Sequence, residues 1–333
     1  MQRPGLTRGK VALGVTCACI AYAAACTAAY AQTAPPRSVR LLVPTSPGGG
    51  TDFSARVIAP KLGEFLGQSI VVENRAGGGT IIGNEAVARA APNGSTLLMG
   101  ISSLTTIPYL HAKVPYELER DLAPISQVVT VPHLLVGHPS LPVRSVQELI
   151  AFAKARPGEI NYAAGSAGSN PHLAMELFNH ITGIRMVHVP FKGQGPALTD
   201  VLGGHTSVMM GNLLSALPHA KAGRLRAFGV SSGKRSTVAP EVPTIAEAGL
   251  SGYEVVQWFG VLAPGGTPGD IITKVHAALV RTLQDASVRE RFVSDGAEPV
   301  GNTPEQFAAV IRADLARWAR VIKAARIKLD GGA

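Results

Sequence analysis

LLVPTSPGGGTD, at residues 41–52, is the stretch that decides the fold of this chain. Residues 39–43 form a short apolar run that is rich in strand-forming residues. Pro44 and Pro47 follow this run, and the strand must end there because proline has no N–H to donate to a sheet ladder. Three glycines come next, so the stretch predicts a strand that leads directly into a glycine loop.

The residues after the glycine loop predict the start of a helix. Thr51 and Asp52 are good helix N-caps, and residues 53–65 alternate like an amphipathic helix. A glycine loop at a helix N-terminus lets backbone N–H groups approach a ligand closely, and the helix dipole favours an anion there. The stretch therefore indicates an anion site, although a tight strand-to-helix connection without a ligand would use the same residues.

The composition of the 333 residues fits a globular protein of about two domains. Hydrophobic residues make up 46% and charged residues 16%, which favours sizeable cores and excludes disorder. The formal net charge is +9, but the basic residues are scattered and not interleaved with aromatic ones. We therefore expect no nucleic-acid partner, whereas a mild positive field suits a small anion.

The first 31 residues have the pattern of an export signal. Three basic residues precede a small, apolar run at 11–29, and an A-x-A cleavage motif ends at Ala31. Cleavage there would leave 28 basic residues against 22 acidic ones, a net charge of +6. We expect a mature protein that is exported and soluble.

All three cysteines lie in this signal segment, at positions 17, 19 and 26. The mature chain would then contain no cysteine, which excludes disulfides, cysteine metal sites and cysteine nucleophiles. Cleavage before Cys26 with lipid attachment is an alternative, but Ala23 stands where a lipoprotein signal usually has leucine.

Two further strand ends in the first half of the chain carry similar donor groups. A strand at 69–72 leads through a glycine loop at 77–80 into a helix at 81–91. A strand at 96–101 ends in a hydroxyl-rich segment at 102–106. Ligands of open parallel sheets bind at the carboxyl ends of the strands, so these three ends together predict a ligand site.

The second half of the chain repeats this organisation. A strand at 160–163, a small-residue loop at 165–170 and a helix at 172–182 form one unit. Another strand, at 206–210, ends at a glycine and Asn212. The repeat predicts two α/β lobes that face one another across a ligand cleft.

The lobes should be joined by two crossings of the chain. We expect these crossings near residues 133–138 and 258–263, where apolar strand segments separate the two halves. A segment at 121–131 is expected to lead into a strand at 133–136.

Motifs that would indicate an enzyme are weak. GVSSG at 229–233 matches the nucleophile elbow G-x-S-x-G, but Pro240 and Pro243 preclude the helix that must follow the serine. Neither glycine loop fits the dinucleotide fingerprint, and the histidines lack paired metal spacing. We therefore expect no catalytic residue, no metal and no cofactor.

Two side chains beside the second-half loops are candidates for the site. His172 lies one residue inside a helix start, where it would face the cleft or serve as a cap or packing residue. Lys192 lies in the loop at 190–196, where it would steer an anion or remain a solvated lysine.

The chain resembles the Bug/TctC family of periplasmic substrate-binding proteins, which serve tripartite tricarboxylate transporters. The resemblance covers residues 37–330 and rests on seven motifs. These are PGGGTD at 47–52, ENR at 73–75, VPFKG at 189–193, LGG at 202–204, VPT at 242–244, WFG at 258–260 and GAEP at 296–299.

The resemblance implies an α/β fold of the two-lobe periplasmic-binding type II, or Venus flytrap, with the ligand cleft between the lobes. We assign residues 36–135 and 261–333 to lobe I and residues 136–260 to lobe II. The implied function is a monomeric receptor, not an enzyme, that binds a small organic carboxylate and delivers it to the membrane subunits of a tripartite transporter. The alternatives are an exported enzyme that acts on a small carboxylate and a binding protein that feeds a sensor kinase.

The loops at the predicted strand ends, together with the positions that match the family's binding loops, give the candidate ligand-binding residues. They are Thr45, Ser46, Gly48, Gly49, Gly50, Thr51, Asp52, Gly78, Gly79, Thr80, Ser102, Ser103, Ser166, Ser169, Asn170, His172, Lys192 and Asn212. The chain departs from many members at Thr45, where they have an aromatic residue, and at residues 206–212, where they have acidic ones. Because a buried ammonium needs an acidic partner, we expect a carboxylate ligand that lacks a free ammonium group.

Overall fold

The computed structural model describes residues 38–165, 167–191, 193–294, 296–324 and 327. The expected export signal, its cleavage site and the three cysteines lie outside these residues. Over the described residues, no helix is both long and apolar enough to cross a membrane.

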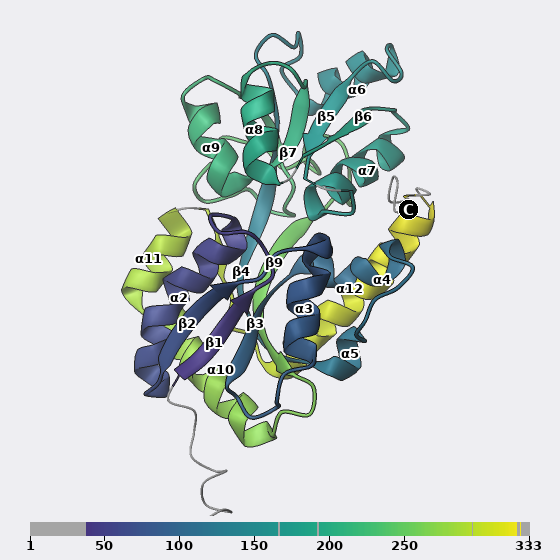
Figure 1. Ribbon diagram of the computed structural model, residues 1–333. Coiled ribbons are helices and arrows are strands. Elements are labelled where there is room, and N and C mark those ends of the chain that lie inside the picture. The colour runs from purple at the N-terminus through teal and green to yellow at the C-terminus, as the bar shows by residue number, and fades with distance from the viewer. Residues whose placement is uncertain (1–37, 166, 192, 295, 325–326, 328–333) are drawn as a thin grey trace, which may run out of the picture. The chain divides into compact units, whose positions relative to one another are not determined.

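Strand β1 (Ser38–Val43) is the centre of a parallel group of strands (Figure 1). It pairs in parallel with β2 (Ser69–Asn74) on one side and with β3 (Thr96–Ile101) on the other. Residues 41–43 are fully buried, as expected of a parallel strand that is covered on both faces. Because parallel strands end at the same edge of a sheet, the two glycine loops and the hydroxyl-rich segment leave this sheet at one edge.

Helix α2 (Gly50–Leu66) begins three residues earlier than the sequence predicts. Its N-cap is Gly49, so Thr51 and Asp52 lie in the first turn and the prediction that they cap the helix is wrong. The physical reason is the Asp52 side chain, which accepts a hydrogen bond from the Gly48 N–H and ties the turn from within the helix.

The long strand β4 (Leu122–Gly137) connects two groups of strands (Figure 1). The strand predicted at 133–136 forms the end of β4, which begins much earlier because the ladder continues through its prolines, with register shifts between Pro124 and Ser126 and between Gln127 and Val129. Its residues up to Pro132 pair with β9 (Val256–Pro264). From His133 onward it pairs with β7 (Val208–Asn212), so β4 changes partner between these two residues.

The second group of strands surrounds β5 (Asn161–Ala164), which pairs in parallel with β6 (Val187–Pro190) and β7. Strand β8 (Arg226–Val230) pairs with β4 in the antiparallel direction. Helices α7 (Asn170–Thr182) and α8 (Gln194–Leu202) follow β5 and β6, which confirms the predicted order of strand, loop and helix. The sheet order is β2-β1-β3-β9-β4-β7-β5-β6.

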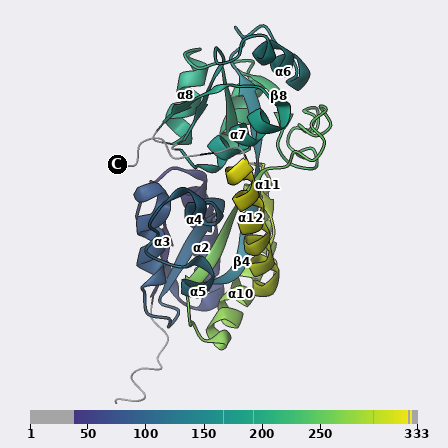
Figure 2. The ribbon, with the colours of Figure 1, turned by 90° about the vertical axis from the view of Figure 1, so that its right-hand side faces the viewer.

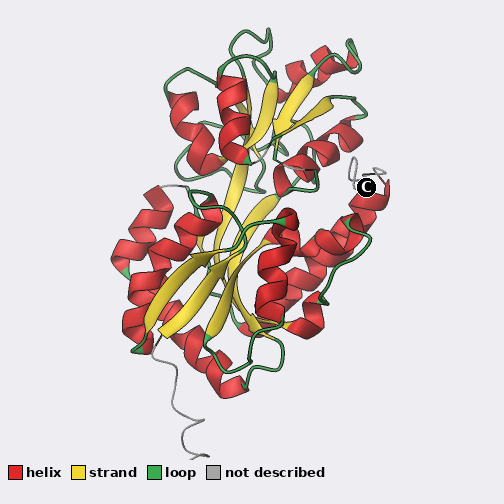
Figure 3. Ribbon diagram, in the orientation of Figure 1, coloured by secondary structure: helices red, strands yellow, loops and turns green. Residues whose placement is uncertain are grey.

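The remaining elements connect or cover these strands (Figure 3). They are η1 (Gly78–Thr80), α3 (Ile81–Ala88), η2 (Ser102–Thr105), α4 (Ile107–Leu110), α5 (Leu118–Asp121), α6 (Val146–Lys154), α9 (Leu213–Lys221), α10 (Gly269–Gln284), α11 (Ala286–Ser294), β10 (Glu298–Pro299) and α12 (Pro304–Ala324). Helix α12 runs along β4, as the turned view in Figure 2 shows.

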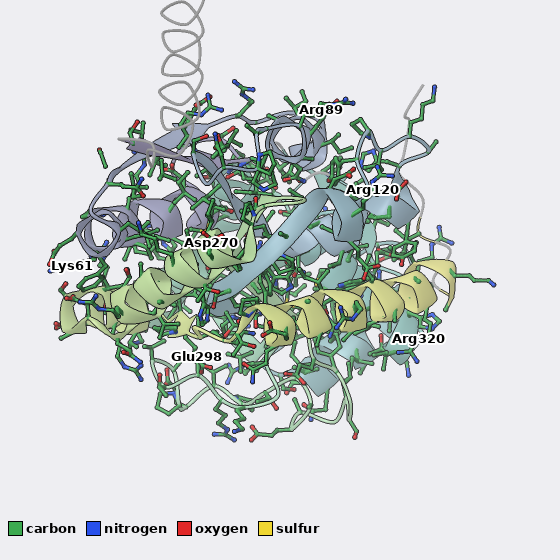
Figure 4. All side chains as sticks on the ribbon, turned by 90° about the horizontal axis from the view of Figure 1, so that it is seen from below. Lys61, Arg89, Arg120, Asp270, Glu298 and Arg320 are labelled. Carbon is green, nitrogen blue, oxygen red and sulfur yellow. The ribbon has the colours of Figure 1, made fainter. Side chains whose placement is uncertain are left out.

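Each strand group has an apolar core of its own, and α12 contributes to both cores. Phe307 and Ile311 pack in a cluster of the β1–β3 group, which we call the first lobe. Trp318 and Ile322 pack in a cluster of the β5–β8 group, which we call the second lobe. None of the six charged residues labelled in Figure 4 is buried.

Candidate ligand-binding site

The first glycine loop is held in place from within helix α2. Gly48 has a φ of +84°, which favours glycine, and its N–H donates to Asp52 Oδ2 at 2.9 Å. Arg56 Nε donates to the same carboxylate at 3.0 Å. Because the N-cap Gly49 has no side chain, the amides of the first turn of α2 have no side-chain cap and can serve a ligand.

Burial and three neighbours, Arg56, the Gly48 backbone and Asn74, determine the ionisation of Asp52. Burial acts to raise the pKa of this carboxyl, but hydrogen bonds from Arg56 and from the Gly48 N–H outweigh it and leave the pKa below its ordinary value. Arg56 also donates a hydrogen bond from Nη2 to Asn74 Oδ1 at 3.0 Å, and Asn74 Nδ2 donates to Thr45 O at 3.1 Å. Asp52 is thus an ionised group that fixes the loop, not a free carboxylate facing a ligand.

Gly50 brings the first glycine loop against the second lobe. A Cβ atom at this position would lie 3.1 Å from Phe259 Cζ and 3.6 Å from Asn212 Nδ2. Only glycine fits at this distance without moving its neighbours. Asn212 ends β7, so the structure brings the predicted residues Gly50 and Asn212 together.

The second glycine loop contains a strained threonine. Of the described residues, Thr80 is the one non-glycine residue with a positive φ, at +88°. A β-branched residue adopts this conformation only at an energetic cost, and such strain clusters at functional sites. Its Oγ1 lies 3.5 Å from Ser103 Oγ and accepts a hydrogen bond from Asn84 Nδ2 at 3.2 Å. The structure thereby joins the second and third predicted strand ends.

A buried hydrogen bond connects the third strand end with the second lobe. Asn170, at the start of α7, donates from Nδ2 to Ser102 Oγ at 3.2 Å. Its Oδ1 lies 2.6 Å from His133 Nε2. Burial lowers the pKa of His133 to about 4, although hydrogen bonds with Asn170 and the Gly211 backbone act in the opposite direction. The imidazole is therefore neutral at pH 7.

His172 lies in a packed group of rings. Its Nδ1 accepts a hydrogen bond from the Gly168 N–H at 3.1 Å, and its ring centroid lies 4.2 Å from that of His188. Burial, assisted by the neighbouring His188, lowers the pKa of His172 to about 3. The packing alternative for this residue thus matches its surroundings, and its neutral ring fixes the loop before α7.

The other predicted residues differ in their surroundings. Ser46, Gly48, Gly49, Gly78 and Gly79 are exposed. The hydroxyls of Thr45 and Ser169 are buried and have no hydrogen-bond partner among the described residues. Ser166 and Lys192 lie outside the described residues.

Three residues that contact the candidate site residues were not predicted from the sequence: His133, Asn84 and Phe259. His133 was visible as a histidine between apolar residues of a strand, whereas Asn84, which is followed by Glu85 at a helix start, gave no such signal. Phe259 lies in the WFG motif and in an expected crossing, but it was not among the candidate ligand-binding residues.

Ser231, the centre of the GVSSG motif, has a structural role. Its Oγ donates to Val255 O at 2.5 Å and accepts a hydrogen bond from the His133 N–H at 2.8 Å. The residue is fully buried between strands, which agrees with the rejection of a nucleophile elbow. Over the described part of the chain, no group of three or more histidine, cysteine or acidic residues could hold a metal ion.

The fold defines a class of protein. Solved structures of similar architecture show that this is a two-lobe α/β protein of the type II periplasmic-binding class. An R. palustris protein, Rpa4515 with adipate, has a TM-score of 0.81 and 38% identity, and the alignment covers 88% of this chain and 99% of that one. MatC from Rhodopseudomonas palustris with bound malate has a TM-score of 0.79 and 32% identity over 87% of this chain and 100% of that one.

The chain belongs to the tripartite tricarboxylate transporter receptor family, whose model matches residues 54–327. BugT of Bordetella pertussis is 42% identical over 301 residues, which are 90% of this chain and 92% of BugT. The family resemblance seen in the sequence motifs is therefore confirmed. Its members are solute-binding receptors and not enzymes.

Proposed function

We propose that the protein is a periplasmic receptor that binds a small organic carboxylate and delivers it to the membrane subunits of a tripartite transporter. The observation that supports this proposal best is the convergence of donor groups from both lobes. The uncapped amides of α2, the hydroxyls of Thr80 and Ser102, and the amides of Asn170 and Asn212 come from loops that contact one another.

The electrostatics of these loops favour an anion. Asp52, the carboxylate of the first loop, is already paired with Arg56 and the Gly48 N–H. The side chains of Thr80, Ser102, Asn170 and Asn212 are hydroxyls and amides, which donate hydrogen bonds well to carboxylate oxygens. The complexes of relatives with adipate and malate support the same ligand class.

The proposed ligand-binding residues are those predicted from the sequence, with Asp52 and His172 acting through the loops that they hold. We place the ligand in a cleft between lobe I, residues 36–135 and 261–333, and lobe II, residues 136–260. Export with cleavage after Ala31 would bring the receptor to the periplasm. We propose that it acts there as a monomer.

A thermal-shift panel tests this function. Purified mature protein is mixed separately with malate, succinate, adipate, citrate and benzoate, and with aspartate and glutamate as matched acids that carry an ammonium group. We expect at least one of the first five acids to raise the melting temperature, since a ligand that binds only the folded state stabilises it. Stabilisation by the amino acids alone would contradict the proposed ligand class.

A further inference from the structure

His133 occupies the point at which β4 passes from the first group of strands to the second. Pro132 still pairs with β9, whereas His133 pairs with Asn212 of β7. Side chains of directly opposite residues lie on the same face of a sheet, so His133 and Asn212 share a face. His133 is fully buried and belongs to none of the sequence motifs.

Two hydrogen bonds lead from the His133 ring to the first lobe. His133 Nε2 lies 2.6 Å from Asn170 Oδ1, and Asn170 Nδ2 donates to Ser102 Oγ at 3.2 Å. All three residues are at most 3% exposed, so water does not compete for these contacts. The second bond joins the two lobes, because Asn170 begins α7 and Ser102 follows β3.

The imidazole tautomer determines which group donates and which accepts in these two hydrogen bonds. A neutral imidazole donates from one nitrogen and accepts at the other. In the observed amide orientation, Asn170 Oδ1 faces Nε2, so Nε2 carries the hydrogen and Asn170 donates onward to Ser102. The Ser102 hydroxyl proton then remains to be donated, and none of the described residues accepts it.

The opposite tautomer would exchange donor and acceptor in both hydrogen bonds. With the proton on Nδ1, Nε2 would accept from the Asn170 amide, and Asn170 Oδ1 would accept from the Ser102 hydroxyl. The neighbouring Gly211 backbone acts to raise the pKa of the ring, so it favours a protonated ring nitrogen. Nδ1, however, makes no hydrogen bond of ordinary geometry with any described residue.

We propose that His133 is a positioning residue that, through Asn170, makes the Ser102 hydroxyl a hydrogen-bond donor toward the bound ligand. This inference rests on the proposed carboxylate-binding function and deepens it. An ionised carboxylate only accepts hydrogen bonds, so its oxygen fits such a donor. A ligand group that only donates, such as an ammonium, does not fit at the same position, and His133 thereby contributes to ligand selectivity.

Two variants separate this positioning role from a packing role. In His133→Gln, the side-chain amide carries an N–H close to the position of Nε2, whereas His133→Met is of similar size and has no donor. Calorimetric titration with malate and adipate should give a dissociation constant for the Gln variant within about threefold of wild type. The Met variant should bind about tenfold more weakly or worse, as expected for an oriented hydrogen bond to a charged group. Equal affinity of wild type and Met, or equal losses in Gln and Met, would overturn the proposal.

The tautomer itself is measured by ¹⁵N NMR of the ligand-free protein at pH 7. The His133 ring signals are identified by their absence in the Gln variant. Protonated Nε2 with unprotonated Nδ1 is expected, and protonated Nδ1 would overturn the proposal. This test does not depend on the folding of the Met variant. Because no ligand is needed, this result stands even if wild type binds neither malate nor adipate, an outcome that would contradict the proposed function alone.

Discussion

The loops before α2 and α7 use the same local device in the two lobes. In each, a glycine with a φ near +80° donates its N–H to the side chain four residues later. Gly48, with a φ of +84°, donates to the Asp52 carboxylate, and Gly168, with a φ of +81°, donates to His172 Nδ1. Both side chains tie the loop to the first turns of the helix that follows it.

The two acceptors differ in charge and surroundings. Asp52 is ionised and paired with Arg56, whose side chain is 54% exposed. His172 is neutral and packs against His188 and Tyr162. Burial of an unpaired charge is costly, and the second loop uses a neutral imidazole as its acceptor where the first uses an ion pair. The comparison teaches that one loop geometry can be combined with two different responses to pH.

Removal of the acid acceptor should have the largest effect. In Asp52→Ala, the Gly48 N–H and Arg56 lose their shared partner, and we expect the free energy of unfolding to fall by about 2–3 kcal/mol. Asp52→Asn keeps an acceptor for Gly48 and should lose less. Urea unfolding at pH 7 measures both. Equal stability of the Ala variant and wild type would show that Asp52 does not hold the loop.

The imidazole acceptor should make stability depend on pH between neutrality and pH 5. Burial and the neighbouring His188 lower the pKa of His172 to about 3, while an unfolded histidine titrates near 6.5. In this window the unfolded chain binds a proton that the folded protein does not, so stability falls as pH falls. From pH 7 to pH 5 the His172 contribution should fall by about 2 kcal/mol.

His172→Asn is the matched variant for this pH dependence. The Asn Oδ1 can accept from the Gly168 N–H in place of Nδ1, but it does not titrate. Between pH 7 and pH 5 the Asn variant should lose about 2 kcal/mol less stability than wild type. The contribution of Asp52 to stability stays constant in this range. Its pKa lies below the ordinary value of 3.8, so this contribution is lost only as pH falls below that value. Parallel stability curves for wild type and His172→Asn would refute the assignment.

The smallest effect should come from two adjacent glycines. Gly48→Ala forces a side chain into a positive φ and should cost about 1 kcal/mol of unfolding free energy. Gly49→Ala is its control, since Gly49 has an extended conformation and its Cβ would meet only Ser46 O at 3.8 Å. Thermal unfolding of both variants measures the difference, which should vanish if the Gly48 conformation is unimportant.

The repeated order of strand, loop and helix could be predicted because it depends on local patterns. The apolar run before Pro44 and the glycines after Pro47 determine the first unit within the chain itself. The continuity of β4 could not be predicted in this way. Its prolines argue against a strand locally, whereas pairing with β9 and β7, far along the chain, holds it together.

The site was predictable only as a set of loops. Ser102, Asn170 and Asn212 were selected because they follow strands, and the structure confirms that they lie at strand or helix ends. The contacts among them depend on tertiary structure, which no local pattern reveals. His133 was missed for this reason, since its partner Asn170 lies 37 residues away.

The most direct measurement of the central claim is a crystal structure of the mature protein with whichever acid of the thermal-shift panel stabilises it most. Our account predicts a ligand carboxylate oxygen within hydrogen-bond distance of Ser102 Oγ, with the first-turn amides of α2 and Asn212 also facing the ligand. A ligand bound away from these loops, or one held by an ammonium group paired with an acidic residue, would contradict it.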